Sequence, residues 1–268
     1  HTEADIRDPE SPKLPEAAKG HVEYRNVSYR YEKGSGDPVL ERVSFTAEPG
    51  ETIGILGETG SGKSTLVNLL PRLYDVMDGQ VLVDGIDVRE YGIQELRKRV
   101  AVVLQETILF TGTIRDNIKW GKQDATEEEV IAAAKAAQAH DFIMELPDGY
   151  DTELGQRGVN VSGGQKQRIS IARALIQNPN IIIFDDSTSA VDSLTEKNIR
   201  QAMRESHPDC TKFIIAQRIS SIRDADKILL LSGGTIAAQG NHKYLMETSE
   251  EYREILASQM KKGVAADV

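Results

Sequence analysis

A glycine-rich segment that ends in lysine and serine is the strongest chemical signal in this sequence. The segment from Gly57 to Ser64 fits the pattern G-x-x-x-x-G-K-[ST] and follows an apolar, strand-like run at 51–56. Glycines let a backbone wrap closely and point successive N–H groups inward, and a helix that follows aims its positive end at the same point. These properties suit a bound phosphate. A flexible glycine turn without a ligand is the alternative interpretation.

This phosphate loop predicts a triphosphate site that also holds Mg²⁺. The Lys63 ammonium would reach the β- and γ-phosphates, and the Ser64 hydroxyl would be a ligand of the metal. The residues predicted to bind the nucleotide in this segment are Gly57, Glu58, Thr59, Gly60, Ser61, Gly62, Lys63, Ser64 and Thr65.

An aspartate that follows a second apolar run belongs to the same prediction. Residues 181–184 are Ile-Ile-Ile-Phe, and Asp185 comes directly after them. Nucleotide-binding α/β folds place an aspartate at the end of such a strand, where it holds Mg²⁺ through water. Read alone, an apolar strand followed by Asp is common, so a structural role is the alternative. Together with the phosphate loop, Asp185 is predicted to be a metal residue.

Composition and charge narrow the class of protein. The chain has 268 residues, 39% hydrophobic and 28% charged, as is ordinary for a globular protein. Its net charge of −10 and pI near 5.1 argue against nucleic-acid binding, although a local basic patch is compatible with them. The lone Cys210 cannot form an internal disulfide. No apolar run approaches the ~18 residues of a membrane span and no secretory signal is visible, while the start at His1 suggests a processed or excised fragment.

Strand-like and helix-like runs alternate along the chain, which predicts an α/β domain with a mostly parallel sheet. The predicted strands are residues 21–31, 39–47, 51–56, 181–184, 212–216 and 227–231, with a hairpin turn at Asp84-Gly85 between 80–83 and 87–88. The predicted helices are residues 63–73, 126–146 and 163–177, the second with a capping box between Thr126 and Glu129. The block 126–177 is predicted to be an inserted helical lobe, and residues 1–20 a linker or the remnant of an excised fragment.

A segment between the phosphate loop and Asp185 resembles the signature of a known family. Val161, Ser162, Gly163, Gly164 and Gln165 resemble the signature sequence of ABC ATPases, whose first residue is Leu or a similar apolar residue. A Ser-Gly-Gly at a helix start is suited to gripping a γ-phosphate. The order of phosphate loop, signature and acidic strand is highly specific, and the resemblance covers residues 21–257.

The resemblance implies a P-loop NTPase (RecA-like) core with an antiparallel β subdomain and an inserted α-helical subdomain at about 106–178, and leaves a tail at 258–268. It also implies ATP and Mg²⁺ as ligands. In the family two such domains pair head to tail, so that each ATP lies between the phosphate loop of one chain and the signature of the other. The signature of this chain would therefore serve the ATP of a partner.

The resemblance assigns roles to four further residues. Tyr31 is similar to the aromatic residue that stacks on adenine. Gln105 is similar to the glutamine that touches Mg²⁺ and the attacking water and links to the membrane domain, so Ser64, Gln105 and Asp185 are the expected metal residues. Ser189 and Asp192 lie in a segment that resembles the loop crossing between the two halves.

Two stretches resemble the exporter branch of the family. They are residues 110–118, Phe-Thr-Gly-Thr-Ile-Arg-Asp-Asn-Ile, and residues 153–158 before the signature. In that branch the loop contacts transmembrane helices, which implies a transmembrane domain, fused upstream or separate, at the cytoplasmic face of a membrane. An ordinary surface turn is the alternative interpretation of this stretch.

Two departures from the family pattern touch the hydrolysis step. Asp186 stands where the family has Glu, which polarises the attacking water, and Asp is shorter by roughly 1.5 Å. Gln217 stands where the family has His near the γ-phosphate, and an amide carries no charge and relays no proton. A softer departure is Gln156, where Glu is frequent. The predicted catalytic residues are therefore Asp186, Gln217 and Gln105, in a site expected to hold ATP but to hydrolyse it poorly.

The intact signature beside an impaired site predicts an asymmetric pair with a different partner chain. Two other functions share the motifs. A soluble ABC protein of DNA repair or translation would carry a coiled-coil insertion or two tandem cassettes, and neither is visible in the sequence. A regulatory ATP-binding module without turnover would differ only in its partner.

Overall fold

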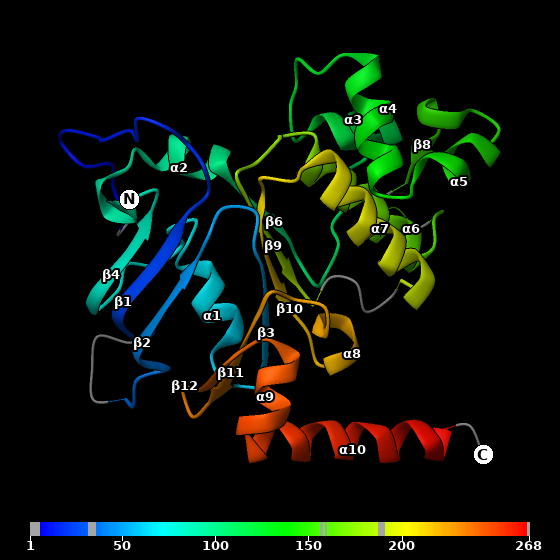
Figure 1. Ribbon diagram of the computed structural model, residues 1–268. Coiled ribbons are helices and arrows are strands. Elements are labelled where there is room, and N and C mark those ends of the chain that lie inside the picture. The colour runs from blue at the N-terminus through cyan, green and yellow to red at the C-terminus, as the bar shows by residue number, and fades with distance from the viewer. Residues whose placement is uncertain (1–5, 32–35, 156–157, 159, 187–190, 267–268) are drawn as a thin grey trace. The chain divides into compact units, whose positions relative to one another are not determined.

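Figure 1 shows the fold in a computed structural model, which describes residues 6–31, 36–155, 158, 160–186 and 191–266. The chain divides into two compact units. Unit 1 comprises residues 1–97 and 211–268, and unit 2 comprises residues 98–210. Unit 1 carries the phosphate loop, and unit 2 carries the signature and Asp185.

An antiparallel sheet makes up one part of unit 1. Its strand order is β2-β1-β4-β5, and its strands are β1 (Val22–Tyr29), β2 (Leu40–Ala47), β4 (Asp78–Val83) and β5 (Ile86–Asp87). Val83 pairs with Ile86, so the turn between β4 and β5 consists of the two residues Asp84 and Gly85, as expected from the sequence. The Tyr24 and Phe45 rings stack at 4.5 Å on adjacent strands. The antiparallel β subdomain is thereby confirmed.

Parallel strands form the second sheet of unit 1. Strand β3 (Thr52–Gly57) lies between β10 (Thr211–Ile215) and β11 (Lys227–Ser232) and runs parallel to both, while β12 (Thr235–Gly240) pairs antiparallel with β11. The side chains of Ile53 and Ile55 are completely buried. The strands of a parallel sheet are buried on both faces, so they need apolar residues at successive positions, which explains the nearly continuous apolar run that the sequence shows here.

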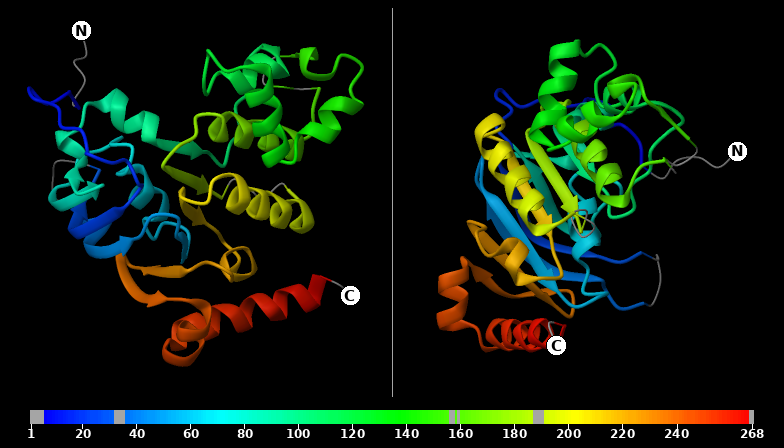
Figure 2. Two further views of the ribbon diagram at one scale, coloured as in Figure 1. Left: turned by 45° about the horizontal axis from the view of Figure 1, so that its top comes forward. Right: turned by 90° about the vertical axis from the view of Figure 1, so that its right-hand side faces the viewer.

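Helices complete unit 1. They are α1 (Lys63–Asn68), α2 (Ile93–Arg99, the last two residues of which fall in unit 2), α8 (Ile219–Ile222), α9 (His242–Thr248) and α10 (Glu250–Ala266). Figure 2 shows α10 as one continuous helix that follows α9. The predicted helix at 63–73 is too long: α1 ends at Asn68, and turns follow, with Arg72 in the left-handed region at φ 50°.

The described part of the N-terminal segment contacts the rest of unit 1. The Asp8 carboxylate accepts a 2.6 Å hydrogen bond from the Ile93 N–H at the start of α2, and Lys13 forms an ion pair with Glu90. The Asp84 carboxylate accepts from the Lys19 and His21 N–H groups. The linker assignment of residues 1–20 and the other predicted domain boundaries remain predictions.

Unit 2 contains two short pairs of strands and a group of helices. Strand β6 (Val100–Val103) runs parallel to β9 (Ile181–Asp185), and β7 (Gly112–Thr113) pairs antiparallel with β8 (Glu153–Leu154). Its helices are α3 (Ile114–Lys119), α4 (Glu127–Ala136), α5 (His140–Glu145), α6 (Gly163–Leu175) and α7 (Ser193–Ser206). Helices α3 to α6 come between β6 and β9 in the chain, as the predicted insertion requires.

The predicted helix at 126–146 is two helices. The capping box is confirmed, since Thr126 Oγ accepts from the Glu129 N–H at 3.3 Å and the Glu129 carboxylate accepts from the Thr126 N–H at 2.9 Å. Helix α4 nevertheless ends at Ala136 because Gln138 adopts the left-handed region at φ 55°.

Within the described residues, no helix combines the length and the apolar character that crossing a membrane requires.

We expect Thr126→Ala to lower the free energy of unfolding by about 1 kcal/mol, because the first turn of α4 loses its side-chain acceptor. Thr126→Ser keeps the hydroxyl and serves as the matched control. Chemical denaturation of the three proteins measures the difference, and equal stability of the Ala and Ser variants would contradict the role of the cap.

Candidate nucleotide site

The phosphate loop leaves β3 at Gly57 and enters α1 at Lys63. Gly57, at φ +157°, is held so closely that a Cβ there would lie 2.4 Å from the Leu231 carbonyl oxygen. Gly62 has φ +96°, and a Cβ there would lie 2.9 Å from the Val39 carbonyl oxygen. Side chains other than hydrogen are therefore excluded at both ends of the loop. The closely wrapped backbone that the sequence predicts for this segment is present in the structure.

Lys63 extends along this loop. Its ammonium donates to the Gly57 carbonyl at 2.9 Å and to the Glu58 carbonyl at 2.7 Å. The Ser61 N–H also donates to the Glu58 carbonyl, at 3.2 Å. A cation and a folded backbone within one short segment form the positive, close-fitting environment that phosphate oxygens require.

Tyr31 belongs to a cluster of three tyrosines in unit 1. Its hydroxyl lies 2.6 Å from Thr65 Oγ1 in the first turn of α1, and the residue is 54% exposed. The ring meets the Tyr29 and Tyr74 rings edge-on at 5.1 and 5.3 Å. The structure therefore ties an exposed aromatic ring to the helix that follows the phosphate loop. Tyr74 was not predicted, because the packing of one ring on another across the chain leaves no local pattern.

Gln217 lies at the same sheet edge as the phosphate loop. Ile215 pairs with Ile55 on the parallel neighbour, and the Ala216 N–H donates to the Ile55 carbonyl at 3.2 Å. Strand β10 ends at Ile215 and β3 ends two positions beyond Ile55, at Gly57, so Gln217 and the phosphate loop both lie at the carboxyl ends of adjacent parallel strands. Ligands of open α/β sheets bind at that edge.

Unit 2 brings Gln105 and Asp186 together. Gln105 follows β6 and Asp186 follows β9, and the Gln105 Nε2 amide donates to Asp186 Oδ2 at 3.4 Å. Asp185 is the last residue of β9. Asp186 has φ +47°, a left-handed conformation that is uncommon for residues other than glycine. Sequence patterns did not predict this conformation.

The signature forms the start of α6. Ser162 is the N-cap: its Oγ accepts from the Gln165 N–H at 3.2 Å, and the Gln165 side chain accepts from the Ser162 N–H at 2.9 Å. Val161 is buried, whereas Ser162 and Gly163 are exposed. The spacing Ser-x-x-Gln is a capping-box pattern, so this cap could have been found in the sequence.

Asp192 caps α7, and its Oδ1 accepts from the Thr195 N–H at 2.9 Å. Hydrogen bonds from the side chain and backbone of Thr195 lower the pKa of the Asp192 carboxyl. Ser189 and Gln156 lie outside the described residues.

The predicted metal residues offer oxygen atoms, which Mg²⁺ prefers. Ser64 supplies a hydroxyl from unit 1, and Gln105 and Asp185 supply an amide and a carboxylate from unit 2. Within the part of the chain that the structure describes, no group of three His, Cys, Asp or Glu side chains could hold a metal ion. A magnesium site of this kind needs few protein ligands, because nucleotide phosphates and water complete its shell. Each of the three residues thus offers a donor of the type that Mg²⁺ binds.

An exposed aromatic pair in unit 2 was also not predicted. The Phe110 and Trp120 rings stack at 4.5 Å, and the two residues are 41% and 58% exposed. The fully buried Asn117 holds Phe110 by accepting from its N–H and donating to its carbonyl, both at 2.8 Å. Arg173 donates to the Asn117 carbonyl and to Asn117 Oδ1, and its guanidinium lies 5.2 Å from the Phe110 ring centre. Burial lowers the pKa of Arg173.

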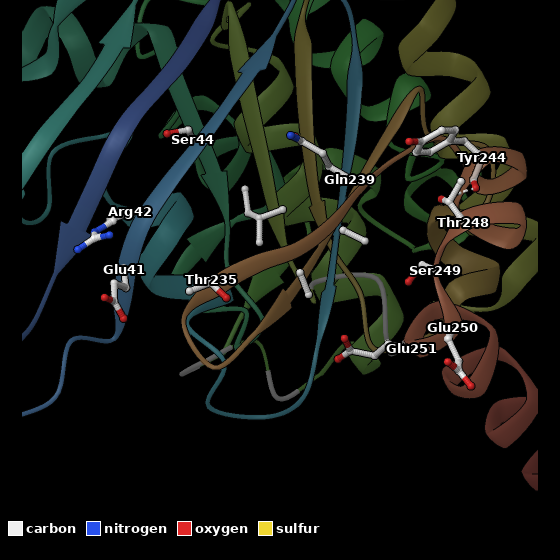
Figure 3. A pocket seen from close by; sticks show the side chains of 13 residues that line it. Glu41, Arg42, Ser44, Thr235, Gln239, Tyr244, Thr248, Ser249, Glu250 and Glu251 are labelled. Carbon is white, nitrogen blue, oxygen red and sulfur yellow. Dashed lines mark hydrogen bonds between the residues drawn. The ribbon is translucent and has the colours of Figure 1, made fainter.

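A groove of about 960 Å³ lies elsewhere in unit 1, between β2, β12 and the start of α10. Figure 3 shows Glu41 and Arg42 on one side and Tyr244 and Glu251 on the other. None of the described residues that line it was predicted for nucleotide binding. Backbone donors and a cation converge at the phosphate loop, which therefore remains the candidate nucleotide site.

Three comparisons relate this chain to known proteins. A sequence model of the family described as ABC transporter matches residues 40–189. YgaD of Bacillus subtilis, named for multidrug export as an ATP-binding/permease protein, is 50% identical over 241 residues, which are 90% of this chain and 41% of YgaD. The ATP-dependent lipid A-core flippase of Syntrophus aciditrophicus is 44% identical over 253 residues, which are 94% of this chain and 41% of the flippase.

The solved structure of a bacterial Atm1-family ABC exporter with ATP bound superposes with a TM-score of 0.91 at 41% identity, covering 96% of this chain and 45% of that one. This match confirms the predicted α/β fold. The chain spans about two fifths of the length of the curated relatives it matches.

The family model covers more than half of the chain, and the matched residues 40–189 include the phosphate loop and the signature. The chain therefore belongs to the ABC transporter family, as an ATP-binding domain of the exporter type.

Proposed function

We propose that this chain drives export across a membrane by pairing head to tail with a second ATP-binding domain around two ATP molecules. The observation that carries the proposal is the presence, in one chain, of a phosphate loop built on β3 and a signature built on the capped start of α6. Each element can grip phosphate from one side. Because ATP binds the closed pair more tightly than the open one, its binding favours closure.

The residues of the site divide the work. Lys63 and the loop amides bind the phosphates, Ser64, Gln105 and Asp185 hold Mg²⁺, and the Tyr31 ring stacks on adenine. Bound Mg²⁺ neutralises charge on the β- and γ-phosphates. Ser162, Gly163 and Gly164 serve the ATP of the partner.

Export is proposed because YgaD is named for multidrug export and the lipid A-core flippase for moving a lipid. The exposed Phe110–Trp120 pair supports contact with a membrane domain, since exposed stacked aromatic rings are typical of protein interfaces. Asn117 and Arg173 fix the position of this pair from inside the unit. The chain would then work at the cytoplasmic face of a membrane, joined to transmembrane helices.

We further propose that the partner is a different chain and that the ATP site built on this phosphate loop hydrolyses slowly. Asp186 has a shorter reach than Glu, and Gln217 cannot carry the charge of His. Since a misplacement of about 1 Å can cost roughly a hundredfold in rate, either change impairs the attack of water. The intact signature leaves the site of the partner competent.

Lys63→Ala should abolish saturable ATP binding by this chain, because the loop loses the cation that reaches the phosphates. Titration calorimetry with ATP and Mg²⁺ measures this. Lys166→Ala, an equal change beyond the signature in α6, is the control and should bind as the wild type does. Unchanged affinity in the Lys63 variant would remove the basis for the proposed site.

Asp186→Glu combined with Gln217→His should raise ATP turnover in the assembled transporter about tenfold or more at this site, as both hydrolysis groups are restored. The measurement compares phosphate release by the complex with and without the two changes. Rapid hydrolysis by the unmodified chain alone, lost with Lys63→Ala, would contradict the slow site.

Trp120→Ser should reduce ATP-driven transport by the whole transporter about tenfold. Docking of a membrane domain would bury this exposed tryptophan, and tryptophans buried in an interface are frequent hot spots. Affinity of the chain for ATP should stay the same. Met144→Ser is the matched control, because Met144 is 59% exposed in the same unit. An equal loss of transport in both variants would rule out a specific docking role for Trp120.

A further inference from the structure

The C-terminal helix of unit 1 is anchored beside α9. Tyr252, in the first turns of α10, is completely buried, and its hydroxyl lies 2.8 Å from His242 Nδ1 at the start of α9. Burial raises the pKa of Tyr252 to about 12, so the hydroxyl stays protonated at neutral pH. The first turns of α10 therefore have a fixed place within the unit, from which the rest of the helix extends.

Two turns further along α10, the side chain of Gln259 forms two hydrogen bonds to the segment that follows β10. Its Nε2 amide donates to the Gln217 carbonyl at 2.8 Å, and its Oε1 accepts from the Ile219 N–H at 2.9 Å. Helix α8 begins at Ile219, and the N-cap Arg218 makes no side-chain cap hydrogen bond. A side-chain amide from a distant helix thus supplies the acceptor that α8 needs at its first N–H.

These two hydrogen bonds lie at the edge of the sheet that carries the phosphate loop. The Ala216 N–H is bonded to the Ile55 carbonyl on β3, two residues before Gly57. Gln217 is the first residue after that bond, and Gln259 fixes its carbonyl. The chain is therefore bonded to β3 at Ala216 and to α10 at the next residue, Gln217.

We propose that Gln259 is a positioning residue that sets the place of Gln217 beside the terminal phosphate of ATP. The proposal rests on the proposed ATP site of this chain. Gln259 acts through the backbone of Gln217 and touches no nucleotide itself. Its contribution must then depend on the γ-phosphate, which ATP has and ADP lacks.

The test uses Gln259→Met, which keeps the length of the side chain and removes both hydrogen bonds. Titration calorimetry of the 268-residue chain with Mg²⁺ and either ADP or a non-hydrolysable ATP analogue gives the two affinities. We expect binding of the ATP analogue to weaken about three- to tenfold, the range for one or two lost hydrogen bonds, and ADP binding to change less than about twofold. Met260→Ala, at the next and 65% exposed position, is the control and should change neither affinity.

A second arm asks whether Gln259 acts through Gln217. In a Gln217→Ala background, Gln259→Met should weaken binding of the ATP analogue by less than about twofold, because the side chain being positioned is absent. Gln259→Glu keeps the acceptor for the Ile219 N–H but sets an oxygen against the Gln217 carbonyl. It should therefore also weaken binding of the ATP analogue selectively, and it serves if Gln259→Met does not fold.

The outcomes separate this inference from the proposed function. Equal weakening of both nucleotides, no weakening at all, or a full effect in the Gln217→Ala background would overturn the positioning role alone. Failure of the unmodified chain to bind either nucleotide would overturn the ATP site, and the positioning role with it.

Discussion

The turn of the backbone at the end of β3 is the constraint on which the rest of the structure depends. Strand β3 is held by parallel neighbours on both edges, and Gly57 pairs with Leu231 so closely that no side chain fits between them. The completely buried Ile53 and Ile55 anchor the strand, and each contributes roughly 1.5–3 kcal/mol by leaving water. A strand so fixed gives the phosphate loop a rigid start, and a rigid loop holds its N–H groups in place before the nucleotide arrives.

Local sequence patterns predicted those elements whose conformation is determined by residues close together in the sequence. The phosphate loop could be predicted because glycine, lysine and serine at fixed spacing have one physical use. The two-residue turn at Asp84-Gly85 and the capping box at Thr126 were equally accessible, since each depends on residues within three positions of one another. The predicted continuation of that helix through Gln138 was wrong, because a single left-handed residue ended it and no glycine marked the place.

Contacts between distant residues could not be predicted in this way. Gln105 and Asp186 meet because β6 and β9 are parallel neighbours, and Gln259 meets Gln217 because α10 is anchored through Tyr252. The role of Asn117 could not be predicted either. In the sequence it is one polar residue of a short helix, whereas in the structure its buried amide positions Phe110. Such roles follow from tertiary packing, and a resemblance to a family predicts only those that the family motif names.

The conformation of Asp186 bears on the proposed asymmetry. Left-handed backbone is occupied more readily by Asp than by Glu, so the short side chain suits the φ of +47° at this position. The signature does not depend on that choice, because Ser162 and Gln165 cap α6 through each other. A chain of this design can lose reach at its own water-activating position while the element that serves the partner stays intact. Separate local causes for the two elements make the proposed unequal pair physically possible, since each ATP site of such a pair would combine one element from either chain.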